Sequence, residues 1–467
     1  MPKALFFPSY HGGGYGHIGR CLALAGALEA RGWDTAIALG GQHLQRARRT
    51  STGSPRQIFP LRQPRSDSAL SRATAQFMEA PRSVLEHLFK KGFSHTRAGT
   101  GPEEQDGLIF TTFSGMNYQL VRDGLISATA IRSSVTEQLV VIRRFRPDVL
   151  VSDAWPLASI LAHLAGLPLV QITRSITHPA GLQLMWWQEL PEGLVPPDPR
   201  PLFNPLLQEW GLPAIARAED LLTGDLHLVP STPALDPLPA GLENTHYIGP
   251  LVHRPSAAVP AWLESLDAGR PVVYLTSGGG AEGVGGLHFY RLLIEALGEC
   301  DLQVVISTGA RCSPAEIATA SPAQVLPANV RLEAWVPGPA VIARSSLVLY
   351  SGGYGTTMEM VAAGVPGLII PSHTEQESNA RRMVAAGAAR LLLPARLPAV
   401  LRWHRWPGGY FSTLTHRIGG LTAAGLRKAI QEAIVDPTLP AGALRLQASV
   451  RCCQGTDRAG ELVEGLV

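Results

Sequence analysis

The chain has 467 residues, of which 45% are hydrophobic and 16% charged, and its formal net charge is +3. This length predicts two domains of about 200 residues each. No apolar run is long enough to span a membrane, and the small charge with scattered arginines argues against a nucleic-acid partner. The five cysteines fit neither a disulfide framework nor a zinc spacing, and the N-terminus lacks the apolar core of a signal peptide, so we expect a cytoplasmic protein.

The first predicted elements are a strand at residues 3–7, a glycine-rich loop at 11–19, a helix at 21–30 and a second strand at 32–39. This order begins a Rossmann-like unit. A dinucleotide fingerprint is only weakly supported, because no Asp or Glu closes the second strand. The loop contains His17, and from the residues alone a helix-capping role for it is the simpler interpretation.

Residues from about 50 to 135 are the least informative part of the first half. Residues 51–71 indicate a loop, and helical apolar spacing follows at 75–89, where Phe77 and Met78 lie. Lys90 and Lys91 end this predicted helix. It could cover an acceptor or touch a membrane surface, but a plain packed helix is the simpler interpretation.

An apolar strand at 147–153 is flanked by Asp148 and Asp153, and a helix at 157–165 and a strand at 167–173 follow it. The apolar stretch at 181–201 is interrupted by prolines. It predicts either a loop over the core or an acceptor wall, for which the sequence offers three candidates. These are Met185, Trp186 and Trp187. Two further strands precede a linker at 251–260.

The second half repeats the strand-loop-helix pattern. A strand at 271–276 ends in Ser277 and Gly278, whose turn offers amides and a hydroxyl to a phosphate. Strands at 303–308 and 330–334 lead to Trp335. An insertion at 394–420 is rich in aromatic residues, and both a partner surface and a lid remain open for it.

Residues 351–380 organise the second half. A short buried strand at 347–350 leads into a tight turn of Ser351, Gly352, Gly353 and Gly355, and a helix follows to residue 363. The N–H groups at the start of this helix, including those of Thr356 and Thr357, and the helix dipole converge on one point. Such an arrangement suits a diphosphate.

Three polar side chains lie close to this turn in the predicted fold. Glu375 and Gln376 follow the next strand, at the edge of the sheet where open α/β folds bind ligands, and they could bind sugar hydroxyls. Glu359, about one helical turn beyond the phosphate turn, could reach a ribose diol. The alternative is an ordinary strand-turn-helix-strand unit with surface Glu and Gln.

Six elements at matching spacing resemble the donor signature of family 1 glycosyltransferases, W-[AV]-P-Q, H-x-G-x-x-S-x-x-E, G-V-P and [DE]-Q-x-x-N-A. They are Trp335-Val336-Pro337, Ser351-Gly352-Gly353, Glu359, Gly364-Val365-Pro366, Glu375-Gln376 and Asn379-Ala380. The resemblance implies that Trp335 stacks on a uracil or thymine base and that Glu359 binds the ribose. It also implies diphosphate contacts from the amides of residues 353–357 and sugar contacts from Glu375 and Gln376.

The signature has two departures in this chain. Ser351 replaces a phosphate-contacting His and is similar to the family 28 pattern, and Gly338 replaces the Gln after W-x-P. The glycine loop before His17 also resembles a family 28 loop. The donor class is therefore better defined than the identity of the donor.

The first half also resembles family 1. Gly16-His17-Ile18 with Leu22, Leu24 and Ala25 matches its opening pattern, and residues 147–153 match P-D-x-V-x-x-D. This similarity implies that His17 is the general base and that Asp153 orients it, whereas Asp148 only caps. The 271–280 segment is similar to the family turn V-Y-x-S-x-G-S.

The resemblance implies an α/β protein with the GT-B fold, in which two Rossmann-like doubly wound domains face each other across a cleft. We expect an acceptor domain at 1–250, the linker at 251–260, a nucleotide-sugar domain at 261–440 that contains the insertion, and a helix at 441–467 that crosses back to the first domain.

The implied reaction is an inverting transfer from a UDP- or dTDP-sugar to a hydroxyl of a mainly apolar, natural-product type acceptor, with no metal and no cofactor. Candidate acceptor contacts are Phe77, Met78, Met185, Trp186 and Trp187.

Three alternatives to this function stay open: a lipid-acceptor glycosyltransferase at a membrane surface, a GT-B sugar-nucleotide epimerase, and a non-catalytic donor-binding protein. An epimerase would need several carboxylates and basic groups rather than one His–Asp pair. A non-catalytic relative would be indicated by loss of His17 or Asp153, and both are present. The sequence does not predict the oligomeric state.

Overall fold

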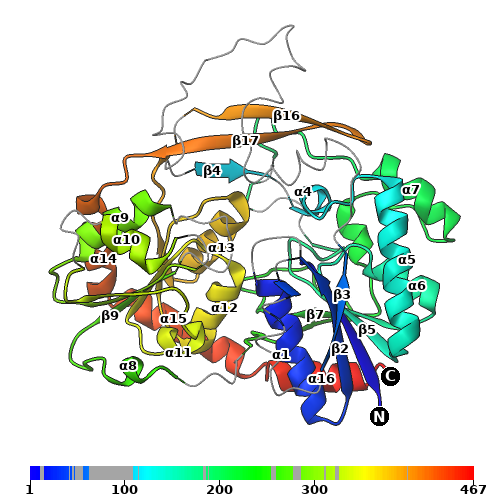
Figure 1. The fold of residues 1–467 in the computed structure, drawn as a ribbon, viewed down its shortest axis with the longest axis horizontal. Helices are drawn as coiled ribbons and strands as arrows, with labels where there is room; N and C mark the ends of the chain where they lie inside the picture. Colours follow the sequence, from blue (N-terminus) through cyan, green and yellow to red (C-terminus); the bar gives the residue numbers. More distant parts are fainter. Residues whose placement is uncertain are drawn as a thin grey trace, which may run out of the picture.

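The computed structural model describes residues 1–10, 15–41, 43–44, 47, 56–62, 109–113, 115–181, 186–187, 189–253, 259–276, 286–309, 312–320, 326–396 and 398–467. They form two parallel sheets flanked by helices and one antiparallel sheet that lies across both (Figure 1). No helix within these ranges has the length and apolarity needed to cross a membrane.

The first sheet has seven parallel strands in the order β3-β2-β1-β5-β6-β7-β8. Its strands are β1 (Lys3–Pro8), β2 (Asp34–Gly40), β3 (Gln57–Leu61), β5 (Val149–Asp153), β6 (Leu169–Ile172), β7 (Leu226–Val229) and β8 (Thr245–Tyr247). Its helices are α1 (Gly16–Ala30), α4 (Gly115–Arg122), α5 (Ala128–Phe145), α6 (Ala158–Ala165), α7 (Arg200–Glu209) and the 3₁₀ helix η3 (Ala218–Leu222). The central strands are continuous apolar runs because helices cover both faces of a parallel sheet.

The second sheet has six parallel strands in the order β11-β10-β9-β12-β13-β14. They are β9 (Val272–Thr276), β10 (Gln303–Ser307), β11 (Val330–Glu333), β12 (Leu347–Tyr350), β13 (Gly367–Ile369) and β14 (Ala389–Leu391). The helices here are α8 (Ala261–Glu264), α9 (Leu287–Leu297), α10 (Pro314–Ala320), α11 (Gly338–Ile342), α12 (Tyr354–Ala363), α13 (Thr374–Ala385) and α14 (Ala423–Val435). The sequence pattern did not predict α13, whose polar start resembles a loop.

Alternation along the strands of the second sheet divides its core into two. Tyr274 and Tyr350 pack in one apolar cluster, whereas Leu275 and Leu349 pack in the other. Successive side chains of a strand point to opposite faces, so each face supplies its own core beneath its own helices. The two doubly wound units confirm the predicted α/β fold class.

The insertion forms an antiparallel hairpin of β16 (Val400–Trp406) and β17 (Gly409–Gly419). The short strand β15 (Ala395–Arg396) pairs with one end of β17, and β4 (Ile109–Thr112), which comes from the first half of the chain, pairs with its middle. Figure 1 shows the hairpin extending across both domains. Backbone pairing to β4 therefore makes the insertion a physical link between the two halves.

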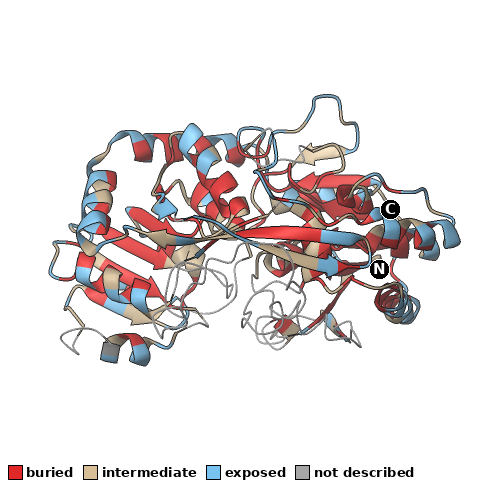
Figure 2. Ribbon diagram, turned by 90° about the horizontal axis from the view of Figure 1, so that it is seen from above, coloured by how far each residue is buried: buried red, intermediate tan, exposed pale blue. Residues whose placement is uncertain are grey.

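The hairpin packs as part of the first domain. Trp406, Phe411 and Leu414 are buried in the first domain's apolar cluster, and the crossing strand is buried along part of its length when seen from above (Figure 2). The Tyr118 hydroxyl donates to the Ser412 carbonyl, and the Ser412 hydroxyl donates to the Gly193 carbonyl at 2.5 Å. Residues far apart in the sequence thus share one core.

The single closing helix expected at 441–467 is wrong. The structure has two helices, α15 (Thr438–Arg451) and α16 (Thr456–Glu464), separated by a turn in which Gln454 and Gly455 have positive φ angles. Left-handed backbone cannot continue a helix, so the chain changes direction there. Gln447 of α15 donates to the Ala362 carbonyl of α12, whereas Arg31 beside α1 pairs with Glu464 of α16. The segment does cross back to the first domain.

Candidate active site

His17 and Asp153 meet at the carboxyl ends of two neighbouring strands. Pro8 of β1 is in register with Asp153 of β5, and His17 lies in the first turn of α1, after the loop that follows β1. His17 Nδ1 lies 2.7 Å from Asp153 Oδ1, and the side chains are 29% and 2% exposed. A Nδ1–H that donates to the carboxylate leaves Nε2 free to accept a proton. The two residues that the sequence paired are therefore brought together.

The sequence pattern missed Arg20, which lies one turn after His17 on α1. Its Nε and Nη2 donate to the two oxygens of Asp153, at 2.7 and 2.9 Å. Burial would raise the pKa of Asp153, but the positive charge of Arg20 and the contacts with His17 hold this pKa below its usual value. Arg20 could have been found in the sequence, because it is an arginine in a largely apolar helix and lies three positions after the candidate base, on the same helix face.

The expected phosphate turn is formed by residues 351–353 between β12 and α12. Gly352 has a φ of +90°, and a Cβ there would lie 2.6 Å from the Gln376 carbonyl oxygen, so only glycine fits. No side chain caps α12, whose N-cap residue is Gly353. Because a helix N-terminus carries unpaired N–H groups and a partial positive charge, this first turn is suited to an anion.

The first turns of α12 and α1 approach each other. An ideal Cβ on Gly355 would lie 3.9 Å from Cα of Gly16. Thr356 and Thr357 belong to the same turn, and the Thr357 hydroxyl is already engaged with Gly353 and Tyr350. The Thr357 amide donates to the Gly353 carbonyl at 3.0 Å, so neither donor of Thr357 is available to a ligand and the expected contact of its amide with a diphosphate is wrong. The candidate anion site and the His17–Asp153 pair therefore adjoin.

Gln376 is turned inward. Its carbonyl oxygen accepts hydrogen bonds from the Ser372 amide and hydroxyl, both at 2.9 Å, and its Nε2 donates to Ser351 Oγ at 3.2 Å. The side chains of both Gln376 and Ser351 are mostly buried. The structure places the pair next to the phosphate turn, but these internal bonds occupy the groups that were expected to bind a sugar.

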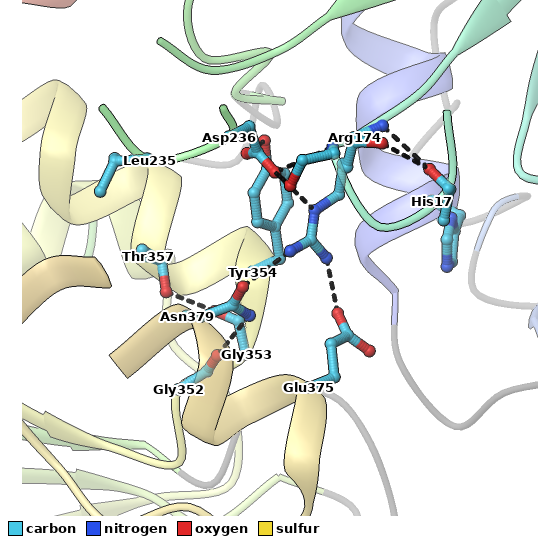
Figure 3. Close-up of polar contacts among 12 residues, drawn as sticks. His17, Arg174, Leu235, Asp236, Gly352, Gly353, Tyr354, Thr357, Glu375 and Asn379 are labelled. Atoms are coloured by element: carbon cyan, nitrogen blue, oxygen red, sulfur yellow. Dashed lines mark hydrogen bonds and ion pairs between the residues drawn. The ribbon is translucent and has the colours of Figure 1, made fainter. Parts of the chain in front are cut away.

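Glu375 lies at the start of α13 and forms an ion pair across the domain boundary. Arg174, two residues after β6, donates from Nη1 to Glu375 at 2.6 Å and from Nη2 to Asn379 at 2.7 Å (Figure 3). Asn379 in turn donates to the Gly352 carbonyl. Burial would raise the pKa of Glu375, but the positive charge of Arg174 lowers it to about 2. Glu375 is therefore ionised and fixed by the first domain.

Tyr354, the first residue of α12, is held between two arginines of the first domain. The guanidinium carbons of Arg174 and Arg20 lie 3.6 and 5.3 Å from the centre of its ring. Its hydroxyl donates to buried Asp236 at 3.0 Å (Figure 3). The same hydroxyl lies 3.1 Å from the Pro230 carbonyl oxygen. Sequence patterns could not reveal this cluster, because its members come from four separate segments.

Glu359 lies further along α12 than Tyr354 and Gly355, and Trp335 lies between β11 and α11. An ideal Cβ on Gly338 would lie 3.2 Å from Glu359 Oε2, so the missing side chain at Gly338 leaves space beside this carboxylate. Burial raises the pKa of Glu359 to about 7. Trp335 is 51% exposed, whereas Val336 is buried in the core. The contacts of Trp335 with a base and of Glu359 with a ribose stay predictions.

The acceptor candidates are described only in part. Phe77, Met78 and Met185, together with the donor candidates Ser277 and Gly278, lie outside the described residues. The rings of Trp186 and Trp187 lie 4.4 Å apart, and the Arg381 guanidinium of α13 lies 5.3 Å from the Trp186 ring centre. Trp187 packs against the first domain's core. Of this pair, Trp186 thus faces the second domain.

The chain is similar in sequence to known glycosyltransferases. A family model described as "Erythromycin biosynthesis protein CIII-like, C-terminal domain" matches residues 291–399. A PGL/p-HBAD biosynthesis glycosyltransferase of Mycobacterium tuberculosis (strain ATCC 25177 / H37Ra) is 29% identical, over 57% of this chain and 64% of its own length. The 4'-demethylrebeccamycin synthase of Lentzea aerocolonigenes is 28% identical, over 74% of this chain and 80% of its own length. The chain therefore matches slightly less than two thirds of the mycobacterial relative.

The solved structure of spinosyn rhamnosyltransferase SpnG superposes on the whole chain. Its TM-score is 0.62, with 18% identity over 99% of this chain and 100% of SpnG. This likeness shows that the chain has the GT-B fold. The family model and the relatives confirm, in addition, the resemblance to macrolide-type glycosyltransferases of family 1.

Proposed function

We propose that the chain is an inverting glycosyltransferase that moves a sugar from a UDP- or dTDP-sugar to a hydroxyl of a mainly apolar small molecule. The observation that carries the proposal is the pairing of His17 with Asp153 beside the uncapped first turn of α12. A candidate base thus adjoins a candidate diphosphate site. Two solved relatives were crystallised with thymidine diphosphate or dTDP, SpnG and the glycosyltransferase VinC, and this supports the donor class.

The proposed chemistry is a direct displacement at the anomeric carbon. His17 Nε2 takes the proton of the acceptor hydroxyl, the acceptor oxygen forms a bond to that carbon, and the bond to the diphosphate oxygen breaks. Asp153 stabilises the imidazolium, which keeps the proton until the nucleotide diphosphate has left. A positioned general base contributes ~10²–10⁴-fold to such a rate.

We propose that main-chain groups rather than a metal stabilise the departing diphosphate. The first turn of α12 offers N–H groups and the positive end of a helix dipole. No D-x-D pair that could hold a cation against a diphosphate occurs in the sequence. Turnover that persists in EDTA is the expected result, and a strict divalent-ion requirement would contradict this account.

The proposed acceptor has an apolar body and one reactive hydroxyl. SpnG was also solved with the spinosyn aglycone, and a second relative is a rebeccamycin synthase, which supports a natural-product acceptor. The mycobacterial relative acts in PGL/p-HBAD biosynthesis, which favours a lipid-like acceptor as the second candidate. A cytoplasmic location stays a prediction from the sequence.

Nucleotide binding is the first test of the proposal. A native-state ligand raises the melting temperature by mass action, so millimolar UDP or dTDP should stabilise the protein and adenine or guanine nucleotides should not. The reverse selectivity would show that the base-site assignment of Trp335 is wrong. Incubation with the sugar nucleotide alone then separates an epimerase, which turns over without an acceptor.

An acceptor screen with two arms tests the second half of the proposal. Polyketide-like, phenolic and terpenoid alcohols form one arm, and lipid acceptors in anionic vesicles form the other. Attraction to anionic lipid is screened over ~10 Å at 0.1 M salt, so binding to vesicles would be reversed by salt. We expect transfer in the first arm. Salt-reversible sedimentation with turnover of lipids alone would instead establish the second candidate.

A further inference from the structure

Arg20 orients the carboxylate that faces the candidate base. Its two contacts with Asp153 form a bidentate pair, and both side chains are almost fully buried, at 7% and 2% exposure. Asp153 Oδ1 accepts hydrogen bonds from both Arg20 Nη2 and His17 Nδ1. A planar guanidinium that holds both oxygens leaves the carboxylate little freedom to rotate. The direction of the His17–Asp153 bond therefore depends on Arg20.

Arg20 also sets the local charge. A buried carboxylate by itself would favour the protonated imidazolium, which cannot act as a base. The permanent positive charge of Arg20, with Nη2 3.1 Å from His17 Nδ1, offsets that carboxylate. Because the Nδ1–H donates to Asp153, Arg20 Nη2 and His17 Nδ1 are both donors and form no hydrogen bond with each other. The guanidinium charge therefore opposes a positive charge on the imidazole ring.

The other charged and titratable groups around this pair come from several elements. Arg20 interacts electrostatically with Cys21 on its own helix, with Tyr354 of α12 and with Arg174 after β6. Glu375 of α13 interacts with His17 and is neutralised by Arg174. With Glu375 already paired, Arg20 is the cation in contact with Asp153 among the described residues. Removing it would leave an unbalanced carboxylate beside His17.

We infer that Arg20 is a positioning residue for the candidate base, and this inference rests on the proposed function. It fixes the Asp153 carboxylate, which orients the His17 ring, and its charge offsets that carboxylate. Its position against the Tyr354 ring places the same guanidinium beside the first turn of α12. Arg20 thus contacts both the carboxylate that orients the base and the first residue of the helix that is proposed to bind the departing diphosphate.

The test compares Arg20→Gln, Arg20→Lys and the wild type in transfer assays from pH 5 to 9. In Arg20→Gln, kcat should fall by ~10²-fold, the size of effect expected for a misaligned catalytic group. The acidic limb of kcat/KM should move to higher pH, because a neighbouring positive charge is lost. Arg20→Lys should keep the wild-type limb but lose kcat, since an ammonium cannot hold both oxygens. Dissociation constants for UDP or dTDP should change less than threefold.

Arg56→Gln is the matched control. Arg56 is another buried arginine of the first domain, and it pairs with Glu29 at the other end of α1. Its loss should lower stability and leave the pH profile unchanged. An Arg20→Gln profile that coincides with the wild type, or an equal shift in Arg56→Gln, would overturn the inference.

A second measurement is independent of catalysis. Diethyl pyrocarbonate modifies unprotonated imidazoles, so peptide mass spectrometry of the His17 peptide across pH reports protonation in the intact chain. The midpoint should rise in Arg20→Gln and stay in Arg20→Lys. If the midpoint rises in Arg20→Gln but the wild type has no transferase activity, only the proposed function is refuted. If the wild type is active but the midpoint does not rise in Arg20→Gln, only the role of Arg20 is refuted. If Arg20→Gln fails to fold, Arg20→Lys decides by its loss of kcat.

Discussion

Nδ1 of His17 and Oδ1 of Asp153 lie 2.7 Å apart although 136 positions separate the residues in the chain. The contact follows from the neighbouring positions of β1 and β5, which end at the same edge of the sheet. A carboxylate on Nδ1 selects the tautomer whose Nε2 can accept a proton. The first prediction concerns this pair.

His17→Ala should reduce turnover by ~10²-fold or more, because a general base contributes about that much. The affinity for UDP or dTDP should persist, since the candidate nucleotide contacts lie on the second domain. Steady-state kinetics and calorimetry measure the two effects separately. Wild-type activity in this variant would return His17 to a structural role as a helix-capping residue.

Glu359→Gln should change the pH dependence of stability. Burial raises the pKa of Glu359 from 4.5 to about 7, so the folded state binds a proton that the unfolded chain has released between these values. Stability from this group is therefore fully present below pH 4.5 and lost as the pH rises through 7. As the pH rises from 4.5 to 7, the free energy of unfolding of the variant should increase by on the order of 1–3 kcal/mol relative to that of the wild type. Urea unfolding at several pH values measures it.

The matched control for Glu359 is Glu295→Gln, because Glu295 is an exposed carboxylate on α9 of the same domain. The prediction fails if the free energies of unfolding of the wild type and of Glu359→Gln change in parallel from pH 4.5 to 7. That result would show that Glu359 is not desolvated in solution.

Arg174→Gln should weaken the contact between the domains. Arg174 joins Glu375, Asn379 and the ring of Tyr354. Breaking a buried ion pair costs about 3–5 kcal/mol, and the cost is smaller here because the Glu375 side chain is 32% exposed. The pKa of Glu375 is about 2 in spite of burial, so its favourable contribution is present above pH 4.5 and is lost as the pH falls toward 2. The stability difference between wild type and variant should shrink over that range.

Urea midpoints from pH 3 to 7 check the Arg174 prediction. Arg200→Gln is the control, because Arg200 is 58% exposed and its pair with Asp198 lies on the surface, where such pairs contribute little to stability. A difference between wild type and Arg174→Gln that stays constant with pH would argue against the Arg174–Glu375 ion pair.

Phe411→Ala should destabilise the first domain although Phe411 belongs to the insertion. The ring is buried against Tyr118 and Trp406 and stacks on His404, and truncation of a buried Phe costs about 3–5 kcal/mol. Tyr410→Ala is the control, because Tyr410 is 56% exposed and its loss should cost under ~0.5 kcal/mol. Chemical unfolding measures the stability of both variants. Similar unfolding midpoints for Phe411→Ala and Tyr410→Ala would show that the hairpin does not share the first domain's core.

Much of the fold and of the donor half of the site follows from local sequence. Apolar strands, glycine turns and helix starts depend on neighbouring residues, so the phosphate turn and the position of Glu359 could be predicted. Gly352 is an example, because its left-handed φ and the close Gln376 carbonyl demand a residue without a side chain. The pairing of His17 with Asp153 required the family resemblance as well, since spacing along the chain does not show which strands are neighbours.

Only the tertiary structure decided how the halves are joined. Arg20, Arg174 and Tyr354 form one cluster because α1, the segment after β6 and α12 meet at the same domain boundary. The position of the insertion likewise depends on the pairing of β17 with β4 and on the hydrogen bond from Tyr118 of α4 to Ser412, 294 positions away in the chain. Local patterns set φ, ψ and the buried face of each element, whereas ion pairs, ring contacts and shared cores depend on which surfaces finally meet, and that is determined by the packing of the whole chain.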